Sequence, residues 1–529
     1  MRSLVRGAPR YTPGLRPLFQ AVMQRPKALY YSVVVFLLAC GSLFLAARHM
    51  SQSVWFDESQ TNLIAHQDTI AGVAKLARTV RPYPPLFFLA VHESLRLRDD
   101  ETGLRMPAAL FGALAIFAVF LLGREVADEF TGAIAAFLFV LTPGAFRYFV
   151  DGNPYTLLVL ASALSMLYLF RASRSNSFRD WLLYALFALL GLSTHILFIF
   201  HFGAHMPAGL YLRSCARATP TTRYKRLMVV MSVLFAVALS WSFLCIYGGD
   251  ARPIVLSRLA HVDLPVTLAG MYLGPLALGG PIPLVLWCPL QLLGAVALFK
   301  SHRDRVWALA ILIGLPLLAI TLFIRSTAEY VAYKYVLGVF PLACIVAAVS
   351  WKAVPLRPVL AKTCFGVAAL AYCLTGAVFI ARAGPDAFGF QDWRSASQYL
   401  NRQAGAGAPV LVTPRSGLLP LTYYYKSPGV SACAPTELGD RVAAHFPVAG
   451  QPGRGVWVVL RTFANDNPLV ARYTEFPASD FGKEVNETVA AIEQRGLSVC
   501  QMAHFHRVTV FAVRSQPCPP ASPAEAASD

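Results

Sequence analysis

Charged residues are scarce in this chain: only 14% of its 529 residues are Asp, Glu, Lys or Arg, whereas 56% are hydrophobic. The mean hydropathy of +0.53 is too apolar for an ordinary soluble globule, so a bilayer must solvate much of the chain. Acidic residues are rarer than basic ones, and the formal net charge is +18. Because the Lys and Arg residues fall mostly between apolar runs, we attribute this excess to membrane topology and expect no nucleic-acid partner.

The chain also lacks a metal-binding cysteine pattern. Its ten cysteines form no CxxC or Cys/His motif, and several, such as Cys40 and Cys245, lie inside apolar runs as small hydrophobic residues. We therefore predict no zinc site. Cys433, Cys500 and Cys518 lie in a polar C-terminal region, where one disulfide can form if that region is extracytoplasmic and oxidised. The sequence leaves the pairing open.

Long apolar runs organise most of the chain. The run 29–47 has the ~20-residue length that a helix needs to cross hydrocarbon, and the basic residues before it predict a cytoplasmic segment over 1–28. No clear small-residue cleavage site follows, so we expect a retained helix. About eleven transmembrane helices are predicted in all, the other runs being 104–123, 131–149, 155–171, 181–199, 201–213, 227–247, 282–299, 306–324, 335–350 and 363–381. Run 201–213 is short and 265–280 is interrupted by Pro and Gly, so either can be re-entrant or interfacial.

The basic residues between the runs predict an orientation. With the N-terminus inside, the main Lys and Arg clusters all lie on the cytoplasmic side, as the positive-inside rule requires. Three polar stretches then lie outside: the first outer loop 48–103, the turn 150–154 and the segment 325–334. A site built across these stretches would face the periplasm or the cell exterior.

The composition turns polar after the last apolar run. Short strand-like segments at 409–413, 455–460 and 508–513 alternate with helical stretches, which predicts a small extracytoplasmic α/β domain over 384–516. The tail 517–529 is rich in Pro, Ala and Ser and is expected to be disordered. The fold class is thus a polytopic α-helical membrane module over 29–383 followed by a small α/β domain.

An acidic pair opens the first outer loop. Asp57 and Glu58 follow Trp55-Phe56, and a helix-like pattern from Glu58 to Arg78 places both carboxylates at a helix N-terminus, where the helix dipole favours negative charge. Helix capping is the simpler interpretation of the pair by itself. Further along the loop, His92 lies in an amphipathic stretch that is typical of a helix on the membrane surface, and it can simply point to water.

Other ionisable residues lie at the predicted outer ends of the spans. Asp151 stands at the mouth of two spans, either as a helix N-cap or as a functional acid. Arg325 and Lys334 lie on the outer side, although basic residues are usually enriched on the cytoplasmic side. A bound substrate phosphate at the level of the outer headgroups would be a natural partner for both. The alternative is that both side chains reach the phosphates of ordinary lipids. Arg105 joins them at the start of its span. Tyr333 fits interfacial anchoring.

In this arrangement the sequence resembles the GT-C superfamily of membrane glycosyltransferases, in the branch of the bacterial lipid A aminoarabinose transferase and the protein O-mannosyltransferases. The segments that carry the resemblance are Trp55 to Glu58, Pro84 to Phe88 with His92, Leu104 to Pro107, Gly123-Arg124, Tyr148 to Tyr155, Ser193 to His195, Lys334-Tyr335 leading to Pro341, and Gln391 to Arg394. Two departures stand out: Tyr83 replaces a His that the family often has before Pro-Pro, and Asp151 replaces a Glu.

The resemblance implies a GT-C catalytic module and an inverting transfer of a sugar from a polyprenyl-phosphate donor to a lipid or glycan acceptor, on the outer face of the bacterial cytoplasmic membrane. Such a reaction needs a carboxylate to take the acceptor proton and cations to stabilise the leaving phosphate. By this analogy Asp57 is the base, supported by Glu58, and Asp151 orients the acceptor or helps Asp57 to hold a metal.

The remaining candidates follow from the same analogy. The donor phosphate is assigned to Arg325, Lys334 and Arg105, with His92, Tyr83 and Tyr333 in supporting roles. A divalent metal fits this chemistry but is not required, because cationic side chains can replace it. The competing class is a lipid-linked-sugar transporter or flippase, which is also polytopic. Neither the sugar nor the acceptor follows from the sequence.

Overall fold

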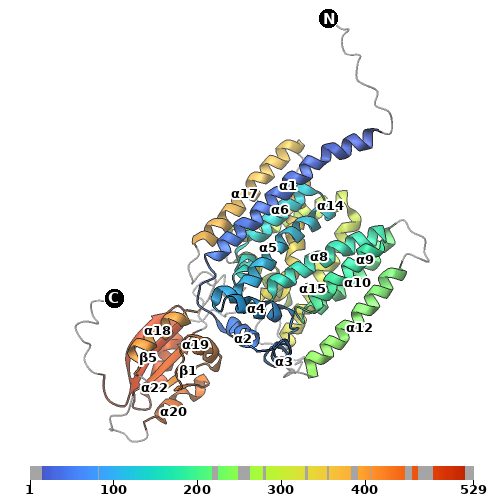
Figure 1. The fold of residues 1–529 in the computed structure, drawn as a ribbon. Coiled ribbons are helices and arrows are strands. Elements are labelled where there is room, and N and C mark those ends of the chain that lie inside the picture. The colour runs from blue at the N-terminus through green and yellow to red at the C-terminus, as the bar shows by residue number, and fades with distance from the viewer. Residues whose placement is uncertain are drawn as a thin grey trace, which may run out of the picture.

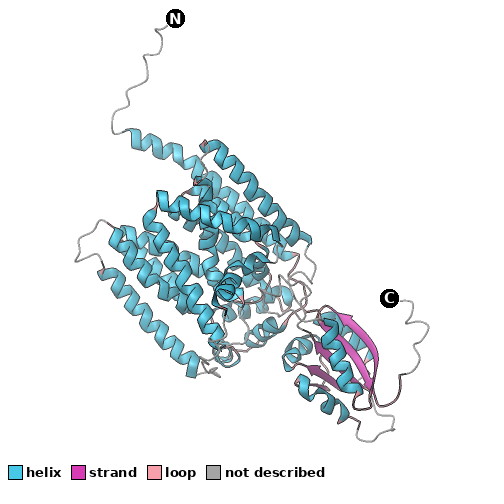
Figure 2. Cartoon of the chain, turned by 180° about the vertical axis from the view of Figure 1, so that it is seen from behind, coloured by secondary structure: helices cyan, strands magenta, loops and turns pink. Residues whose placement is uncertain are grey.

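A helical bundle and a small α/β domain make up the molecule. The computed structural model describes residues 15–81, 83–216, 224–247, 263–277, 281–327, 332–353, 357–382, 391–405, 407–446, 455–462 and 481–518. In Figure 1 the small domain lies at one end of the bundle, and Figure 2 shows from behind that the strands of the described chain are confined to it. The predicted fold class, a helical membrane module with a C-terminal α/β domain, is confirmed.

Seven helices in the described part of the chain are long and apolar enough to cross a membrane. They are Leu29–Ala47 within α1 (Leu15–Ala47), α5 (Glu101–Val126), α8 (Tyr155–Ser175), Pro283–Ser301 within α14 (Pro281–Ser301), α15 (Arg303–Thr327), Tyr333–Lys352, and Lys362–Arg382 within α17 (Pro358–Arg382). The sixth combines the 3₁₀ helix η3 (Tyr333–Val339) with α16 (Phe340–Val349) and η4 (Ser350–Lys352). The pair α6 (Glu129–Val140) and Pro143–Phe149, which is bent by 70°, makes an eighth if it is one span.

The other predicted runs are helical as well, but they do not meet the same criteria. These are α9 (Phe178–Leu192), α10 (Phe198–Cys215) and α12 (Lys225–Tyr247); the interrupted stretch after them forms α13 (Leu264–Ala277). α9 has only 15 residues and α13 only 14, which is less than the ~20 that span hydrocarbon. Among the described residues, seven or eight spans by length and composition thus compare with about eleven predicted, and each predicted run overlaps at least one helix.

The bundle presents apolar side chains outward. Leu37 of α1, Leu186 of α9 and Val285 of α14 are among many large hydrophobic residues that are more than half exposed. Monomeric soluble proteins rarely leave such faces uncovered, whereas lipid tails cover them in a membrane. The chain is a multi-pass membrane protein.

The loop 48–103 folds into three short helices at the end of the bundle that carries the small domain: α2 (Phe56–Ala65), α3 (Ile70–Val80) and α4 (Leu86–Leu97). The single helix predicted over 58–78 is therefore broken, because Thr69 caps a new helix by accepting the Gly72 N–H at 3.0 Å. α4 begins directly after Pro84-Pro85, where proline is tolerated because the first helical N–H groups have no partner within the helix.

The small domain is a three-layer α/β fold. Its mixed sheet has the order β2-β1-β3-β5-β4, with parallel β1 pairs and antiparallel β5 pairs. The strands are β1 (Val410–Thr413), β2 (Val430–Ala432), β3 (Val456–Arg461), β4 (Ser498–Phe505) and β5 (Val508–Arg514). One apolar core lies under α18 (Trp393–Gln403) and α19 (Leu418–Tyr424), and a second lies under α20 (Leu438–Ala443) and α22 (Phe481–Glu493). The three predicted strands are confirmed.

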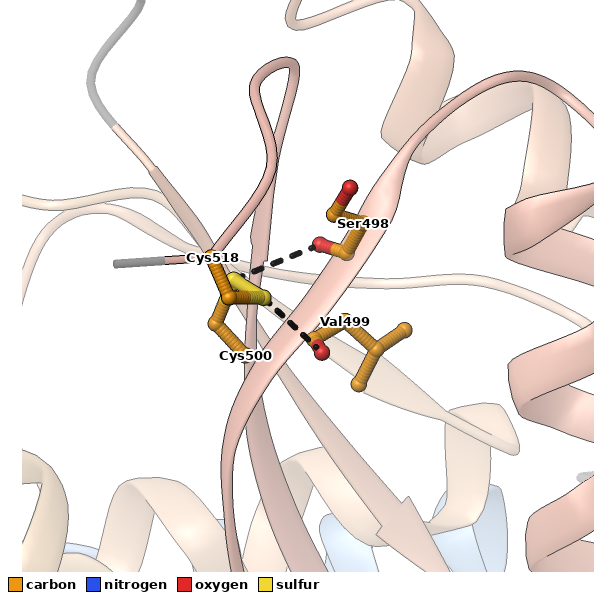
Figure 3. The surroundings of a disulfide bond; sticks show 4 residues. All are labelled: Ser498, Val499, Cys500 and Cys518. Atoms are coloured by element: carbon orange, nitrogen blue, oxygen red, sulfur yellow. Dashed lines mark hydrogen bonds between the residues drawn. A yellow bond between two sulfur atoms is a disulfide. The ribbon is translucent and has the colours of Figure 1, made fainter. Parts of the chain in front are cut away.

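A disulfide resolves the open cysteine pairing. Cys500 of β4 is bonded to Cys518, with 5.5 Å between their Cα atoms (Figure 3). Cys433 is a free buried thiol. The bond ties the chain that leaves β5 back to the edge strand β4. Residues 519–529, most of the predicted disordered tail, lie outside the described residues.

Candidate active site at one end of the helical bundle

Asp57 lies in the first turn of α2, and two cations contact one of its oxygens. Lys334 Nζ is 3.1 Å from Asp57 Oδ2, and Arg81 Nη2 is 3.3 Å from the same atom. Lys334 comes from η3 and Arg81 directly follows α3, so segments far apart in the sequence meet on this carboxylate. The side chain of Asp57 is 14% exposed, whereas Glu58 and Asp151 are fully buried. Asp57 is thus the one predicted carboxylate of the three that solvent or a substrate reaches.

Glu58 is sealed into a different set of contacts. Its two oxygens accept hydrogen bonds from Arg105 Nε at 2.6 Å and Nη2 at 2.5 Å, and neither side chain is exposed. Glu58 Oε1 also accepts the Gly152 N–H at 2.8 Å, and Oε2 accepts the Trp55 N–H at 3.4 Å. The bond to Trp55 makes the capping interpretation correct for Glu58. This carboxylate therefore holds the start of α2 against the turn 150–154.

The other end of Arg105 is bound to the backbone of the loop. Its Nη1 donates to the carbonyl oxygens of Met50 at 2.8 Å and Gln52 at 2.7 Å, and Nη2 donates to that of Ser53 at 3.0 Å. Together with Glu58, these acceptors engage every nitrogen of the buried guanidinium. The geometry favours a structural role for Arg105 over contact with a donor phosphate.

Asp151 is linked to Asp57 through Asn153 and Arg81. Asp151 Oδ1 accepts hydrogen bonds from Trp55 Nε1 at 3.2 Å and from the Asn153 side-chain amide, while Arg81 Nη1 donates to Asn153 Oδ1 at 2.7 Å. The second oxygen, Oδ2, is buried and has no hydrogen-bond partner among the described residues. Asp151 does not cap α8, whose N-cap is Pro154, so that alternative is wrong.

The surroundings give the two carboxyl groups opposite protonation behaviour. Burial alone would raise the pKa of Asp57, but Lys334 and then Arg81 outweigh it and lower this pKa to about 2. Burial, followed by the nearby Glu58 carboxylate, raises the pKa of Asp151 to about 7. Asp57 is therefore ionised at neutral pH, while Asp151 exchanges a proton there. Neighbouring carboxyl groups whose pKa values are shifted in opposite directions are characteristic of active sites.

Aromatic rings surround the Lys334 ammonium. Its Nζ lies 5.7 Å from the ring centroid of Trp55, 5.8 Å from that of Tyr155 and 5.4 Å from that of Tyr335. At such distances the ring faces stabilise the cation in addition to Asp57. The Tyr155 hydroxyl is buried in this enclosure and has no hydrogen-bond partner among the described residues. A ligand oxygen placed beside Lys334 would satisfy it.

Comparisons with known proteins bear on the fold that carries this site. Residues 82–241 match the family described as dolichyl-phosphate-mannose-protein mannosyltransferase. Two crystal structures of ArnT from Cupriavidus metallidurans resemble the chain, one in the apo state and one bound to undecaprenyl phosphate. The apo form has a TM-score of 0.57 at 12% identity and covers 92% of this chain and 98% of that one. The bound form has a TM-score of 0.53 at 13% identity, with 91% and 98% covered. The chain has the GT-C fold.

An archaeal enzyme extends the likeness. The apo oligosaccharyltransferase of Archaeoglobus fulgidus has a TM-score of 0.50 at 12% identity and covers 84% of this chain and 71% of that chain. No curated protein matches the chain in sequence. The predicted resemblance to the GT-C superfamily is confirmed at the level of the fold.

Within the GT-C fold, the supporting candidates occupy different places. Tyr83 packs its ring 4.4 Å from that of His195 and 5.2 Å from the guanidinium carbon of Arg81, so it lines the site. His92 Nδ1 bonds the Ala65 carbonyl oxygen at 2.8 Å, which fastens α4 to the end of α2. The alternative that His92 points to water is therefore wrong.

Two further candidates lie on η3 and α15. Tyr333 donates to the Gly144 carbonyl at 3.4 Å and so fastens η3 to the bent segment Pro143–Phe149. Arg325 donates to Thr267 Oγ1 at 3.5 Å, and its Nε is buried without a hydrogen-bond partner among the described residues. No described contact joins Arg325 to Asp57 or Lys334. Its assignment to the donor phosphate stays a prediction.

The described residues do not form a metal site. They contain no group of three or more His, Cys, Asp or Glu side chains placed to hold an ion. Asp57 and Asp151, the predicted ligands, are instead bridged by Arg81 and Asn153. Arg81 and Asn153 were missed from the sequence. Arg81 carried a usable signal, because it is a basic residue in a predicted outer loop, as Arg325 and Lys334 are.

Proposed function

We propose that this chain is a GT-C glycosyltransferase that moves a sugar from a polyprenyl-phosphate donor to an acceptor hydroxyl, with inversion at the anomeric carbon. The observation that carries the proposal is the convergence of Lys334 and Arg81 on a single oxygen of the accessible Asp57. The GT-C fold, the match to a mannosyltransferase family and the undecaprenyl phosphate bound by the ArnT crystal support it.

The three side chains supply the two functions that the reaction needs. Asp57 takes the proton of the acceptor hydroxyl as that oxygen attacks the anomeric carbon, and the bond from this carbon to the phosphate oxygen breaks. Lys334 and Arg81 stabilise the negative charge that grows on the departing phosphate. Arg81 presents several donors in one plane, which suits a phosphate, and Lys334 acts as a point charge.

Donor binding also makes Asp57 a better base. A carboxylate with a pKa of about 2 holds a proton weakly, because Lys334 and Arg81 stabilise its ionised form. When a donor phosphate shares these two cations, their effect on Asp57 decreases and its pKa rises toward the ordinary range. Asp57 is thus the strongest base when the donor is bound.

The second carboxyl group positions the acceptor. Asp151 Oδ2 is buried without a hydrogen-bond partner among the described residues. Because Asp151 is fully buried, it acts through the Asn153–Arg81 bridge: it holds Arg81 at Asp57, where the acceptor hydroxyl arrives. Because cations already accompany Asp57, we propose that transfer does not require a divalent metal.

The proposed location is the cytoplasmic membrane of a bacterium, with the site and the C-terminal domain on the outer side. The basic segment 1–28 and the basic clusters between the spans favour a cytoplasmic N-terminus. The Cys500–Cys518 disulfide supports an oxidising compartment for the C-terminal domain. The proposed partners are a polyprenyl-phosphate sugar, a lipid or glycan acceptor and membrane lipids.

A turnover assay tests the proposal. Purified protein in liposomes is incubated with a panel of polyprenyl-phosphate sugars and candidate acceptors, and released polyprenyl phosphate is measured. We expect release with one donor class, dependent on acceptor and absent in Asp57→Asn. A flippase would move donor across the bilayer and release no polyprenyl phosphate. Folded protein that moves donor without release from any member of the panel would contradict the proposal.

A further inference from the structure

A cation of the C-terminal domain reaches the helix that carries Asp57. Arg461 ends β3, and its guanidinium carbon lies 5.2 Å from the ring centroid of Phe56, the residue before Asp57. Its Nη1 donates to Ser416 Oγ at 2.7 Å, and the residue is only 4% exposed. Arg461 is therefore held by its own domain on one side and by the first residue of α2 on the other.

The small domain is fixed to the bundle at the entry to α2. The Trp393 N–H donates to Ser53 Oγ at 3.0 Å, and the Val54 N–H donates to the Tyr424 hydroxyl at 2.8 Å. Arg394 Nη2 pairs with Glu101 Oε1 at 2.5 Å. Ser53 and Val54 stand three and two residues before Phe56 in the chain. The contacts that dock the domain therefore also fix the position of the start of α2.

The charge of Arg461 reaches Asp57 as well. Lys334 and Arg81, which belong to the membrane module, are the principal cations at this carboxylate, and Arg461 adds a smaller contribution that also lowers its pKa. If a donor phosphate engages Lys334 and Arg81, Arg461 stays on Phe56, because Ser416 and the ring hold it. The contribution of Arg461 to the pKa of Asp57 is therefore the one that the small domain controls.

We propose that Arg461 is a positioning residue of the Asp57 site, through which the C-terminal domain sets the place and the charge of the base. The inference rests on the proposed function only where it concerns turnover. A planar guanidinium stacks on an aromatic ring and donates sideways at the same time, which an ammonium does not reproduce. The C-terminal domain is then part of the catalytic unit and not only a docking module.

Paired variants test the proposal. Arg461→Gln removes the charge, and Arg461→Lys retains the charge without the planar group. The matched control is Arg415→Gln, because Arg415 lies in the same domain but pairs with Glu437 at 3.0 Å on the surface. We expect Arg461→Gln to lower kcat about tenfold, with the donor KM changed less than about twofold. Arg461→Lys should recover part of this loss in kcat. The Arg415→Gln control should match wild type.

A second readout does not depend on turnover. The pH dependence of carbodiimide modification of Asp57, followed by peptide mass spectrometry, reports the ionisation of that carboxyl in each variant. We expect its midpoint to rise in Arg461→Gln by up to about one pH unit and to stay in Arg415→Gln. Phe56→Leu should lower kcat as Arg461→Gln does, and the double variant should be no slower than the slower single one, because both remove the same contact.

The outcomes separate the two proposals. If Arg461→Gln leaves either the Asp57 midpoint or kcat at the value of the Arg415→Gln control, the role of Arg461 is overturned. If wild type releases no polyprenyl phosphate from any donor, the proposed function fails, while the Asp57 midpoint still decides the role of Arg461. Melting temperatures and gel-filtration profiles of the variants identify any that fail to fold, and Arg461→Lys then carries both measurements.

Discussion

Two carboxylate clusters lie side by side at the end of the bundle, and they differ in access. Glu58 and Arg105 form a bidentate pair in which neither side chain is exposed. Asp57, one residue earlier, shares Lys334 and Arg81 and keeps 14% of its side chain exposed. The sealed cluster satisfies its charges completely within the protein, whereas the open cluster leaves the Asp57 carboxylate partly exposed beside two nearly buried cations.

The difference shows how neighbouring acids divide structure from chemistry. An ion pair that is fully buried and hydrogen-bonded stabilises one arrangement of the chain, and it has no free donor or acceptor for a ligand. Here it joins the start of α2 to Met50, Gln52, Ser53 and Gly152. The rigid frame that results holds Asp57 against Lys334 and Arg81. The comparison predicts that variants of the two clusters fail in different ways.

The largest effect is expected from Asp57→Asn. The amide keeps the shape of the side chain but does not accept the proton, so turnover should fall about 10²- to 10⁴-fold. Melting temperature should fall, because the nearly buried Lys334 and Arg81 lose their ionised partner, but folded protein should still be recovered. The measurement is polyprenyl phosphate released per folded molecule, and a variant that turns over at a wild-type rate would remove Asp57 from the role of base.

The sealed cluster should respond in stability. Arg105→Met leaves the buried Glu58 without its principal partner, which typically costs about 3–5 kcal/mol. We expect a loss of folded protein on thermal denaturation in detergent. The double variant Glu58→Gln/Arg105→Met should recover part of the loss, because it leaves no buried charge. Full stability of Arg105→Met would show that the pair does not hold the loop.

A smaller effect on catalysis is expected from single cations. Lys334→Gln and Arg81→Gln each remove one of the two groups that stabilise the phosphate, so turnover should fall on the order of a hundredfold. Arg325→Gln is the comparison, because Arg325 contacts Thr267 and not Asp57. We expect it to weaken donor use less, measured as kcat/KM for the donor. Equal losses in all three variants would place Arg325 in the same phosphate site.

The smallest effect concerns the pH dependence of stability. The raised pKa of Asp151, about 7, means that the folded protein holds a proton between the ordinary value of 3.8 and 7 that the unfolded chain has released. Stability contributed by this group therefore falls as the pH rises through that window. Asp151→Asn should gain melting temperature relative to wild type between about pH 5 and about pH 8. A constant difference across this range would contradict the shift.

The fold was predictable because its signals are local. Runs of apolar residues gave every membrane helix, and β-rich segments gave the three inner strands of the small domain. The number of spans was not predictable in this way, since α9 is too short to cross hydrocarbon although it is apolar. The edge strands β2 and β4 were missed because β2 has only three residues, and β4 has a single buried residue and an irregular register that breaks the alternating pattern.

The sequence predicted most residues of the site but not which of them contact one another. Topology and family resemblance brought Asp57, Glu58, Asp151, Lys334 and Arg105 together as candidates. The pairing of Glu58 with Arg105 depends on side chains 47 positions apart in the chain, which no local pattern specifies. Asn153 and Arg461 were missed for the same reason, because their roles arise only when distant segments meet, whereas Arg81 carried a signal as a basic residue in a predicted outer loop.

The most direct test compares adjacent residues in one assay. Wild type, Asp57→Asn and Glu58→Gln are purified, the folded fraction of each is quantified, and release of polyprenyl phosphate is divided by that fraction. The account predicts almost no turnover per folded molecule for Asp57→Asn, and a reduced folded fraction with retained turnover per folded molecule for Glu58→Gln. The reverse pattern, with an active Asp57→Asn and a stable but inactive Glu58→Gln, would contradict it.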